Sequence, residues 1–99
     1  MLRKFSLSRA AAADLDDIFF YTIETFGLRQ AERYYLAIQE ALQQIANMPD
    51  LGRTIPGRTR AFRQFNCQRH GIFYTVGAEG IFIVRILHLA MNFKAHLPQ

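Results

Sequence analysis

Two neighbouring apolar runs in the C-terminal third constrain the fold of this chain more than any other feature. Residues 69–76 and 81–88 are rich in aromatic and β-branched side chains, and a glycine-containing turn at 77–80 separates them. Two such runs with a short link form an antiparallel pair of strands. Because each run is apolar on both faces, we expect interior strands of a sheet that other elements cover on at least one side.

The second of these runs contains an arginine, Arg85. Charged groups that leave water are usually paired, which leaves two interpretations: an ion pair with an Asp or Glu of the helices, or a place on a binding surface. Strict alternation along a strand predicts two sets of side chains on opposite faces: Ile83, Arg85 and Leu87 on one, and Val84, Ile86 and His88 on the other. We therefore expect Arg85 and His88 not to form one catalytic pair, unless the strand bends or twists between them.

The first half of the chain predicts one strand and two helices. Residues 4–7 alternate polar and apolar side chains, as in a short strand. Ser8 is a good N-cap for the helix that follows, and Gly27 is a good left-handed C-cap. A second apolar stripe at helical spacing covers residues 31–45 and ends before Pro49. The short joint between the helices predicts an antiparallel hairpin.

These elements predict an α+β fold in one domain, residues 1–99. After a loop at 50–60, a strand at 61–66 precedes the two apolar runs, so the last three strands form an antiparallel meander. With the N-terminal strand, the meander completes a four-stranded sheet. The first strand joins at the edge of the meander or beside its last strand.

The two halves of the chain differ in charge. Residues 1–50 carry five basic and seven acidic groups, whereas residues 51–99 carry seven basic groups and only Glu79 as an acid, a net charge of +6. Such a half suits an anionic partner, either nucleic acid or an acidic protein segment, although a solvated basic face is the alternative. The candidate binding residues are Arg53, Arg58, Arg60, Arg63, Arg85, Lys94 and His96.

Two aspartates, Asp14 and Asp17, lie on one face of the first predicted helix. A pair of carboxylates can act as acid and base in hydrolysis. No second motif supports that chemistry, and the helix dipole alone favours aspartate in the first turns. We expect an electrostatic role for both residues near the beginning of the helix.

The remaining reactive residues predict no metal or cofactor site. His70, His88 and His96 lack the four-residue spacing of zinc-binding histidines, and the lone Cys67 can form no internal disulfide. No apolar run reaches the length of a membrane span, and no signal-peptide pattern begins at position 1. We therefore expect a cytoplasmic protein that uses no cofactor and no membrane.

Several short segments, taken in their order and spacing, resemble the ParE toxins of the RelE/ParE superfamily. The resemblance covers nearly the whole chain and is strongest in its closing stretch. The segments that carry it are Leu7-Ser8, Ala13 to Ile18 with Tyr21, Phe26-Gly27 before Gln30-Ala31, Pro49 before Leu51-Gly52-Arg53, His70 to Tyr74, Arg85 to His88, Met91-Asn92 and His96-Leu97.

The resemblance implies the toxin of a type II toxin–antitoxin pair, of the kind that stabilises plasmids or chromosomes. ParE toxins are associated with poisoning DNA gyrase, so that cleaved DNA accumulates and replication stalls. The implied partner is a ParD-like antitoxin, with a ribbon-helix-helix half that binds DNA and a second half that folds as it wraps the toxin. An acidic, amphipathic segment of that kind suits the basic half of this chain, and we expect a hetero-oligomeric complex.

The same superfamily offers an alternative, the RelE-like ribosome-dependent mRNA endonuclease. Arg63 and Arg85 resemble the sheet arginines of that enzyme, and His88, or alternatively His96, would then be the acid or base. The set is incomplete, because the loop at 50–60 has no lysine and the tail after His88 has no tyrosine. A gyrase inhibitor that is not itself a catalyst is therefore the preferred interpretation.

Overall fold

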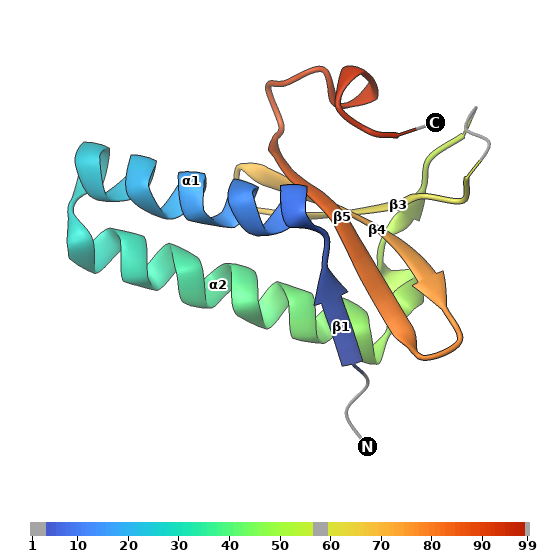
Figure 1. Cartoon of the computed structure of the whole chain (residues 1–99). Helices are drawn as coiled ribbons and strands as arrows, with labels where there is room; N and C mark the ends of the chain where they lie inside the picture. Colours follow the sequence, from blue (N-terminus) through green and yellow to red (C-terminus); the bar gives the residue numbers. More distant parts are fainter. Residues whose placement is uncertain (1–3, 57–59, 99) are drawn as a thin grey trace.

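The computed structural model of the chain describes residues 4–56 and 60–98. Figure 1 shows two long antiparallel helices beside a twisted sheet. The elements in chain order are β1 (Lys4–Leu7), α1 (Arg9–Phe26), α2 (Leu28–Asn47), the short 3₁₀ segment η1 (Pro49–Leu51), β2 (Arg53–Thr54), β3 (Arg63–Cys67), β4 (His70–Gly77), β5 (Gly80–His88) and the 3₁₀ segment η2 (Phe93–Ala95).

The sheet confirms the predicted α+β class but has five strands, in the order β1-β5-β4-β3-β2, so the predicted count of four is wrong. The extra strand, β2, consists of Arg53 and Thr54 and pairs antiparallel with β3 inside the segment predicted to be a loop. Two residues are too few to show an alternating pattern. The first strand lies at the edge of the sheet and also beside the last strand, and it pairs with β5 in parallel.

Local sequence signals set the helix ends as expected. The Ser8 hydroxyl accepts the Ala11 N–H at the beginning of α1, and Gly27, at φ 92°, separates α1 from α2. The first turn of α1 contains no acidic residue. Since the dipole effect fades within the first turn, the expected electrostatic role at the helix beginning does not account for Asp14, which lies further along.

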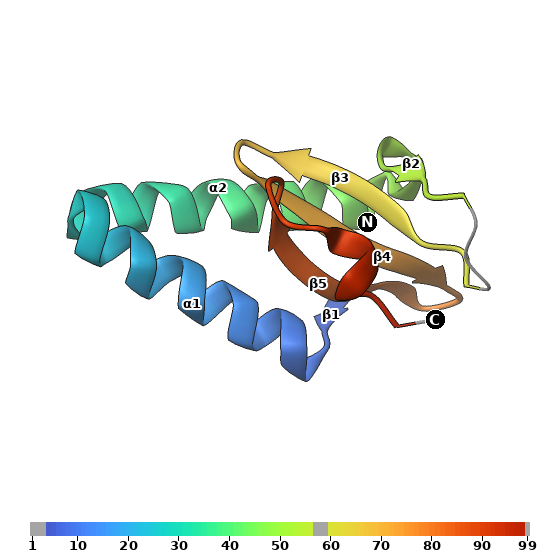
Figure 2. The ribbon, with the colours of Figure 1, turned by 90° about the horizontal axis from the view of Figure 1, so that it is seen from above.

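The sheet has an apolar core on each face. The helices cover one face, where Leu15, Ile38 and Leu42 pack with Ile72 and Tyr74 of β4 among other buried residues. On the other face the C-terminal tail folds back over β4 and β5 (Figure 2). The buried residues there are Ile55, Phe62, Phe73, Val84, Leu87 and Leu97. The expected cover on at least one side is confirmed, and the structure adds cover on the second side.

A bulge interrupts the pairing of β4 with β5. Phe73 pairs with Arg85, whereas the next residue, Tyr74, pairs with Ile83, so Val84 has no partner across the ladder. A bulge of this kind shifts the alternation of side chains by one position.

The shift corrects the face assignment made from strict alternation. Ile83 and Ile86 both belong to the core on the helix face, whereas Val84 and Leu87 both belong to the core on the tail face.

In the described part of the chain, neither helix is long and apolar enough to cross a membrane.

Candidate functional site

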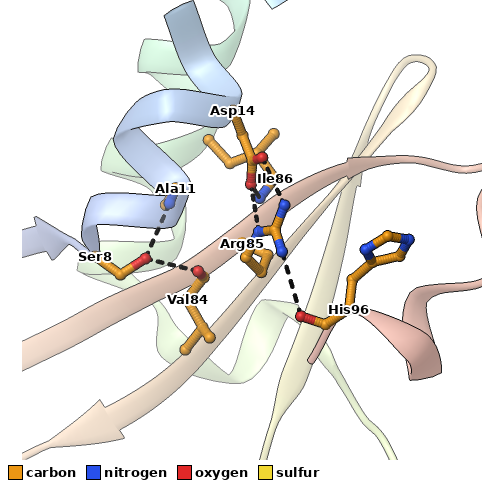
Figure 3. Close-up of polar contacts among 7 residues, drawn as sticks. All are labelled: Ser8, Ala11, Asp14, Val84, Arg85, Ile86 and His96. Atoms are coloured by element: carbon orange, nitrogen blue, oxygen red, sulfur yellow. Dashed lines mark hydrogen bonds and ion pairs between the residues drawn. The ribbon is translucent and has the colours of Figure 1, made fainter. Parts of the chain in front are cut away.

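The side chain of Arg85 has a partner, Asp14 of α1 (Figure 3). Its Nε donates to Oδ2 of Asp14 at 2.7 Å, and its Nη2 donates to Oδ1 at 2.8 Å. The two side chains are only 23% and 13% exposed, and the hydrogen bond to Asp14 is the main cause that raises the pKa of Arg85. Of the two interpretations of Arg85, the structure bears out the ion pair with a helix carboxylate. Asp14, so engaged, forms no acid–base pair with the exposed Asp17.

The ion pair belongs to a larger set of hydrogen bonds that connects the beginning of α1 with β5. β1 pairs with β5 only as far as Ile83. Beyond that point the Ser8 hydroxyl donates to the Val84 carbonyl oxygen at 2.7 Å, and Oδ2 of Asp14 accepts the Ile86 N–H at 3.0 Å. Side chains of the helix thus satisfy the backbone groups that β1 leaves open. Arg85 also donates through Nη1 to the His96 carbonyl oxygen at 3.3 Å, so the C-terminal tail is bonded to the same residues.

Arg63 is likewise engaged within the fold, on β3, which lies next to the edge strand β2. Its Nη1 donates to the Gly52 carbonyl oxygen at 2.6 Å, and its Nη2 lies 3.4 Å from Oδ1 of Asp50. Asp50 is 97% exposed, so this ion pair is weak. The hydroxyl of Tyr74 donates to the Pro49 carbonyl oxygen at 2.5 Å and accepts the Gly52 N–H at 2.9 Å. Arg63 and Tyr74 together hold η1 and β2 against the sheet.

Four of the seven predicted binding residues have exposed side chains: Arg53, Arg60, Lys94 and His96. Arg53 also donates to Oε1 of Gln64 at 2.9 Å. Arg58 lies outside the described residues. The exposed members come from β2, the loop before β3 and the tail, whereas Arg63 and Arg85 are tied into the fold.

The three residues of the endonuclease alternative have three separate sets of partners. Arg63 bonds to the η1–β2 segment, and Arg85 bonds to α1 and the tail. His88 accepts the Ala90 N–H on its Nδ1 at 3.0 Å, in the turn after β5. These contacts do not assemble one catalytic group.

A pocket of about 530 Å³ opens between the far end of the helical hairpin and the β3–β4 turn. It is lined by Tyr21, Thr22, Phe26, Gln30, Tyr34, Gln68, Arg69, His70 and His88. The sequence does not predict this pocket, because Tyr34 falls within the apolar stripe of residues 31–45 and no spacing brings His70 and His88 together. Prediction of the pocket would require knowledge of the bulge at Val84. The bulge sets the register of β4 and β5 in which His70 pairs with His88.

The floor of the pocket is a small polar cluster. Nδ1 of His70 lies 2.5 Å from the Tyr34 hydroxyl, which is also 3.3 Å from the Cys67 carbonyl oxygen. The rings of His70 and His88 meet edge to face at a centroid distance of 5.2 Å. Burial, aided by His88, lowers the pKa of His70 to about 4. His70 is therefore neutral at physiological pH.

Within residues 4–56 and 60–98, no three His, Cys, Asp or Glu side chains gather in a way that would hold a metal ion. The pocket floor contains two imidazoles and no carboxylate. Its polar groups suit hydrogen bonding to a ligand more than metal coordination.

Comparison with solved structures shows that another protein has a similar fold. The chain matches a structure described as "Chromosomal ParDE TA system from P. aeruginosa" with a TM-score of 0.74 over 88% of this chain and 96% of that one, at 22% identity. The helical hairpin and the mixed sheet are thus an arrangement found in a protein of a toxin–antitoxin system.

Sequence comparison gives the family. The family model described as "ParE toxin of type II toxin-antitoxin system, parDE" matches residues 5–93. Toxin ParE1 of Caulobacter vibrioides is 36% identical over 96 residues, which cover 97% of this chain and 99% of that protein. Toxin ParE1 of Mycobacterium tuberculosis is 35% identical over 98 residues, which cover 98% of this chain and 100% of that protein.

These matches define the chain as a toxin of a type II toxin–antitoxin system. It belongs to the ParE family of such toxins.

Proposed function

We propose that this toxin inhibits DNA gyrase and that a ParD-like ribbon-helix-helix antitoxin neutralises it in a hetero-oligomeric complex. The observation that carries the proposal is the family match over residues 5–93, in a family whose description pairs ParE with the parDE system. The solved relative described as a ParDE system supports the same pairing of toxin and antitoxin.

The surface of the chain suits a partner that is acidic and amphipathic. Arg53, Arg60 and Lys94 give it exposed basic groups. Large apolar side chains are also exposed along the hairpin: Phe20, Tyr21, Phe26, Leu28 and Leu36 are each at least half exposed. Tyr21 and Phe26 also line one pocket, so at least these two can contact one partner together.

The endonuclease alternative receives less support from the geometry. Arg63 and Arg85 are held in different parts of the fold, and His88 lines a pocket that neither of them lines. Cleavage of RNA by a set of basic groups requires them to surround one phosphate.

Expression in cells tests the proposal and separates the two targets. Induction of the toxin alone should arrest growth, and co-expression of the ribbon-helix-helix protein from the neighbouring reading frame should restore it. Plasmid from arrested cells should contain cleaved or relaxed DNA, while mRNA in the ribosomal A site should remain intact. Cut mRNA with normal plasmid topology would support the endonuclease instead, and normal growth without the antitoxin would overturn both readings.

A further inference from the structure

The pocket beside the β3–β4 turn has the size and position of a binding site. Its volume of about 530 Å³ lies within the range of about 300–1,000 Å³ that is usual for ligand pockets. Tyr21, Phe26 and Gln30 line it from the helical hairpin, and Gln68 and Arg69 line it from the turn. The mouth is therefore formed by two parts of the chain that lie far apart in sequence.

The chemistry of the lining favours an anion. Arg69 contributes a permanent positive charge, and no Asp or Glu is among the lining residues. The Arg69 side chain is exposed and forms no ion pair among the described residues. Its backbone, by contrast, is fixed, because its carbonyl oxygen accepts the Leu89 N–H at 2.9 Å. The guanidinium group is thus presented at the pocket from an anchored turn.

The turn itself adopts an unusual conformation. Gln68 has φ 53°, the only positive φ at a non-glycine residue in the described chain. Cys67 pairs with His70, so Gln68 and Arg69 form a two-residue hairpin turn, and such turns require a positive φ at their first central residue. Here the turn places two polar side chains, Gln68 and Arg69, at the mouth of the pocket.

The rim next to the cation is apolar. Tyr21 and Phe26 are 65% and 60% exposed, although both line the pocket. A carboxylate flanked by apolar side chains would meet Arg69 and these two rings together. A free small anion would leave both rings in water.

We propose that this pocket receives an acidic side chain of the antitoxin, with its carboxylate on Arg69 and the flanking apolar residues of the antitoxin on Tyr21 and Phe26. The inference rests on the proposed antitoxin partner and assigns one contact of that complex to this pocket. A carboxylate on Arg69 that is covered by apolar residues packed on Tyr21 and Phe26 is partly shielded from water, so the loss of this pair costs more than that of a fully exposed pair.

Calorimetric titration with the ribbon-helix-helix antitoxin from the neighbouring reading frame tests the contact. Arg69→Glu should weaken binding about tenfold or more, and Arg69→Lys should weaken it less. Arg9→Glu is the matched control, because Arg9 is exposed at the opposite end of α1 and the charge change is the same. It should change the affinity by less than about threefold. Circular dichroism melts check that all three variants fold.

The outcomes separate this inference from the proposed function. If wild-type toxin binds the antitoxin and Arg69→Glu binds equally well, the pocket is not the contact and the partner assignment stands. If Arg69→Glu and Arg9→Glu weaken binding equally, only net charge matters and the inference also fails. If the wild-type toxin does not bind the antitoxin, the proposed partner is wrong and the inference falls with it. Some antitoxin variants would have one acidic residue changed to Lys. The variant that restores binding to the Arg69→Glu toxin would identify the acidic residue whose carboxylate contacts Arg69.

Discussion

Arg85 of β5 and Asp14 of α1, 71 positions apart in the sequence, form a two-pronged ion pair with donor–acceptor distances of 2.7 and 2.8 Å. Asp14 also accepts the N–H of Ile86 at 3.0 Å. One carboxylate therefore joins the first helix to both the side chain and the backbone of the last strand. An arginine within the most apolar strand is explained by this structural role.

Removal of either partner should destabilise the fold. Asp14→Ala or Arg85→Ala leaves the charge of the remaining partner largely buried and unpaired. Asp14→Ala also removes the oxygen that accepts the Ile86 N–H. We expect a loss of about 2–4 kcal/mol in the free energy of unfolding, measured by urea denaturation. Asp17→Ala, on the same helix but exposed, should change it by less than about 0.5 kcal/mol. An Arg85→Ala protein of normal stability that no longer binds antitoxin would instead make Arg85 a binding residue.

Tyr74→Phe should loosen the segment that follows α2. The hydroxyl of Tyr74 donates to Pro49 and accepts the buried Gly52 N–H, so its removal leaves that N–H without an acceptor. We expect a loss of about 1–3 kcal/mol in urea denaturation. Tyr35→Phe removes a hydroxyl from a side chain that is 38% exposed and should have little effect. Equal stability of the two variants would show that the bonds to η1 and Gly52 are not important.

The stability of the toxin should fall as the pH decreases from about 7 towards 4. The pKa of His70 is about 4 in the folded chain, against about 6.5 when unfolded. The unfolded chain therefore binds the proton first, and the stability contributed by neutral His70 is present above pH 6.5 and lost towards pH 4. His88 lowers this pKa and Asp14 raises it, but burial has the largest effect.

Because His70 is only partly shielded from water, we expect an effect of about 1–2 kcal/mol. The measurement is the free energy of unfolding at several pH values, for the wild type and for His70→Gln. The advantage of the wild type should shrink across this window, whereas His96→Gln, with an exposed side chain, should follow the wild type throughout. A difference between wild type and His70→Gln that does not change with pH would contradict the assignment.

The exposed basic residues should speed the encounter with an acidic antitoxin. Arg60→Ala combined with Lys94→Ala should lower the association rate constant severalfold at low salt, and the difference should shrink as salt is added. Surface plasmon resonance measures the rate. Arg9→Ala combined with Arg29→Ala removes the same charge from exposed positions of the helices and should slow association less. Equal slowing by both pairs would indicate an effect of net charge alone.

The parts of the fold that local signals govern could be predicted from the sequence. Ser8 and Gly27 mark the ends of α1 because capping depends on neighbouring backbone groups. The hairpin of β4 and β5 follows from two apolar runs with a short turn between them. The sequence left two interpretations of Arg85 open, an ion pair and a binding surface, and only the fold shows that its partner is Asp14.

The parts that depend on register could not be predicted. The bulge at Val84 leaves no mark in the pattern of apolar residues, yet it moves Val84 to the tail face and sets His70 opposite His88. Tyr34 has ordinary core spacing in its helix, and only the tertiary structure shows that its hydroxyl meets His70 at the floor of a pocket. Side-chain roles that arise from pairing between distant segments require the assembled fold.

Purified gyrase with supercoiled plasmid and ATP gives the most direct test of the proposed function. We expect the toxin to trap cleaved DNA, seen as linear plasmid after the enzyme is denatured, and an equimolar or greater amount of antitoxin to prevent it. Normal supercoiling without cleaved DNA, in the presence of folded toxin well above the gyrase concentration, would contradict the proposal that this ParE toxin acts on gyrase.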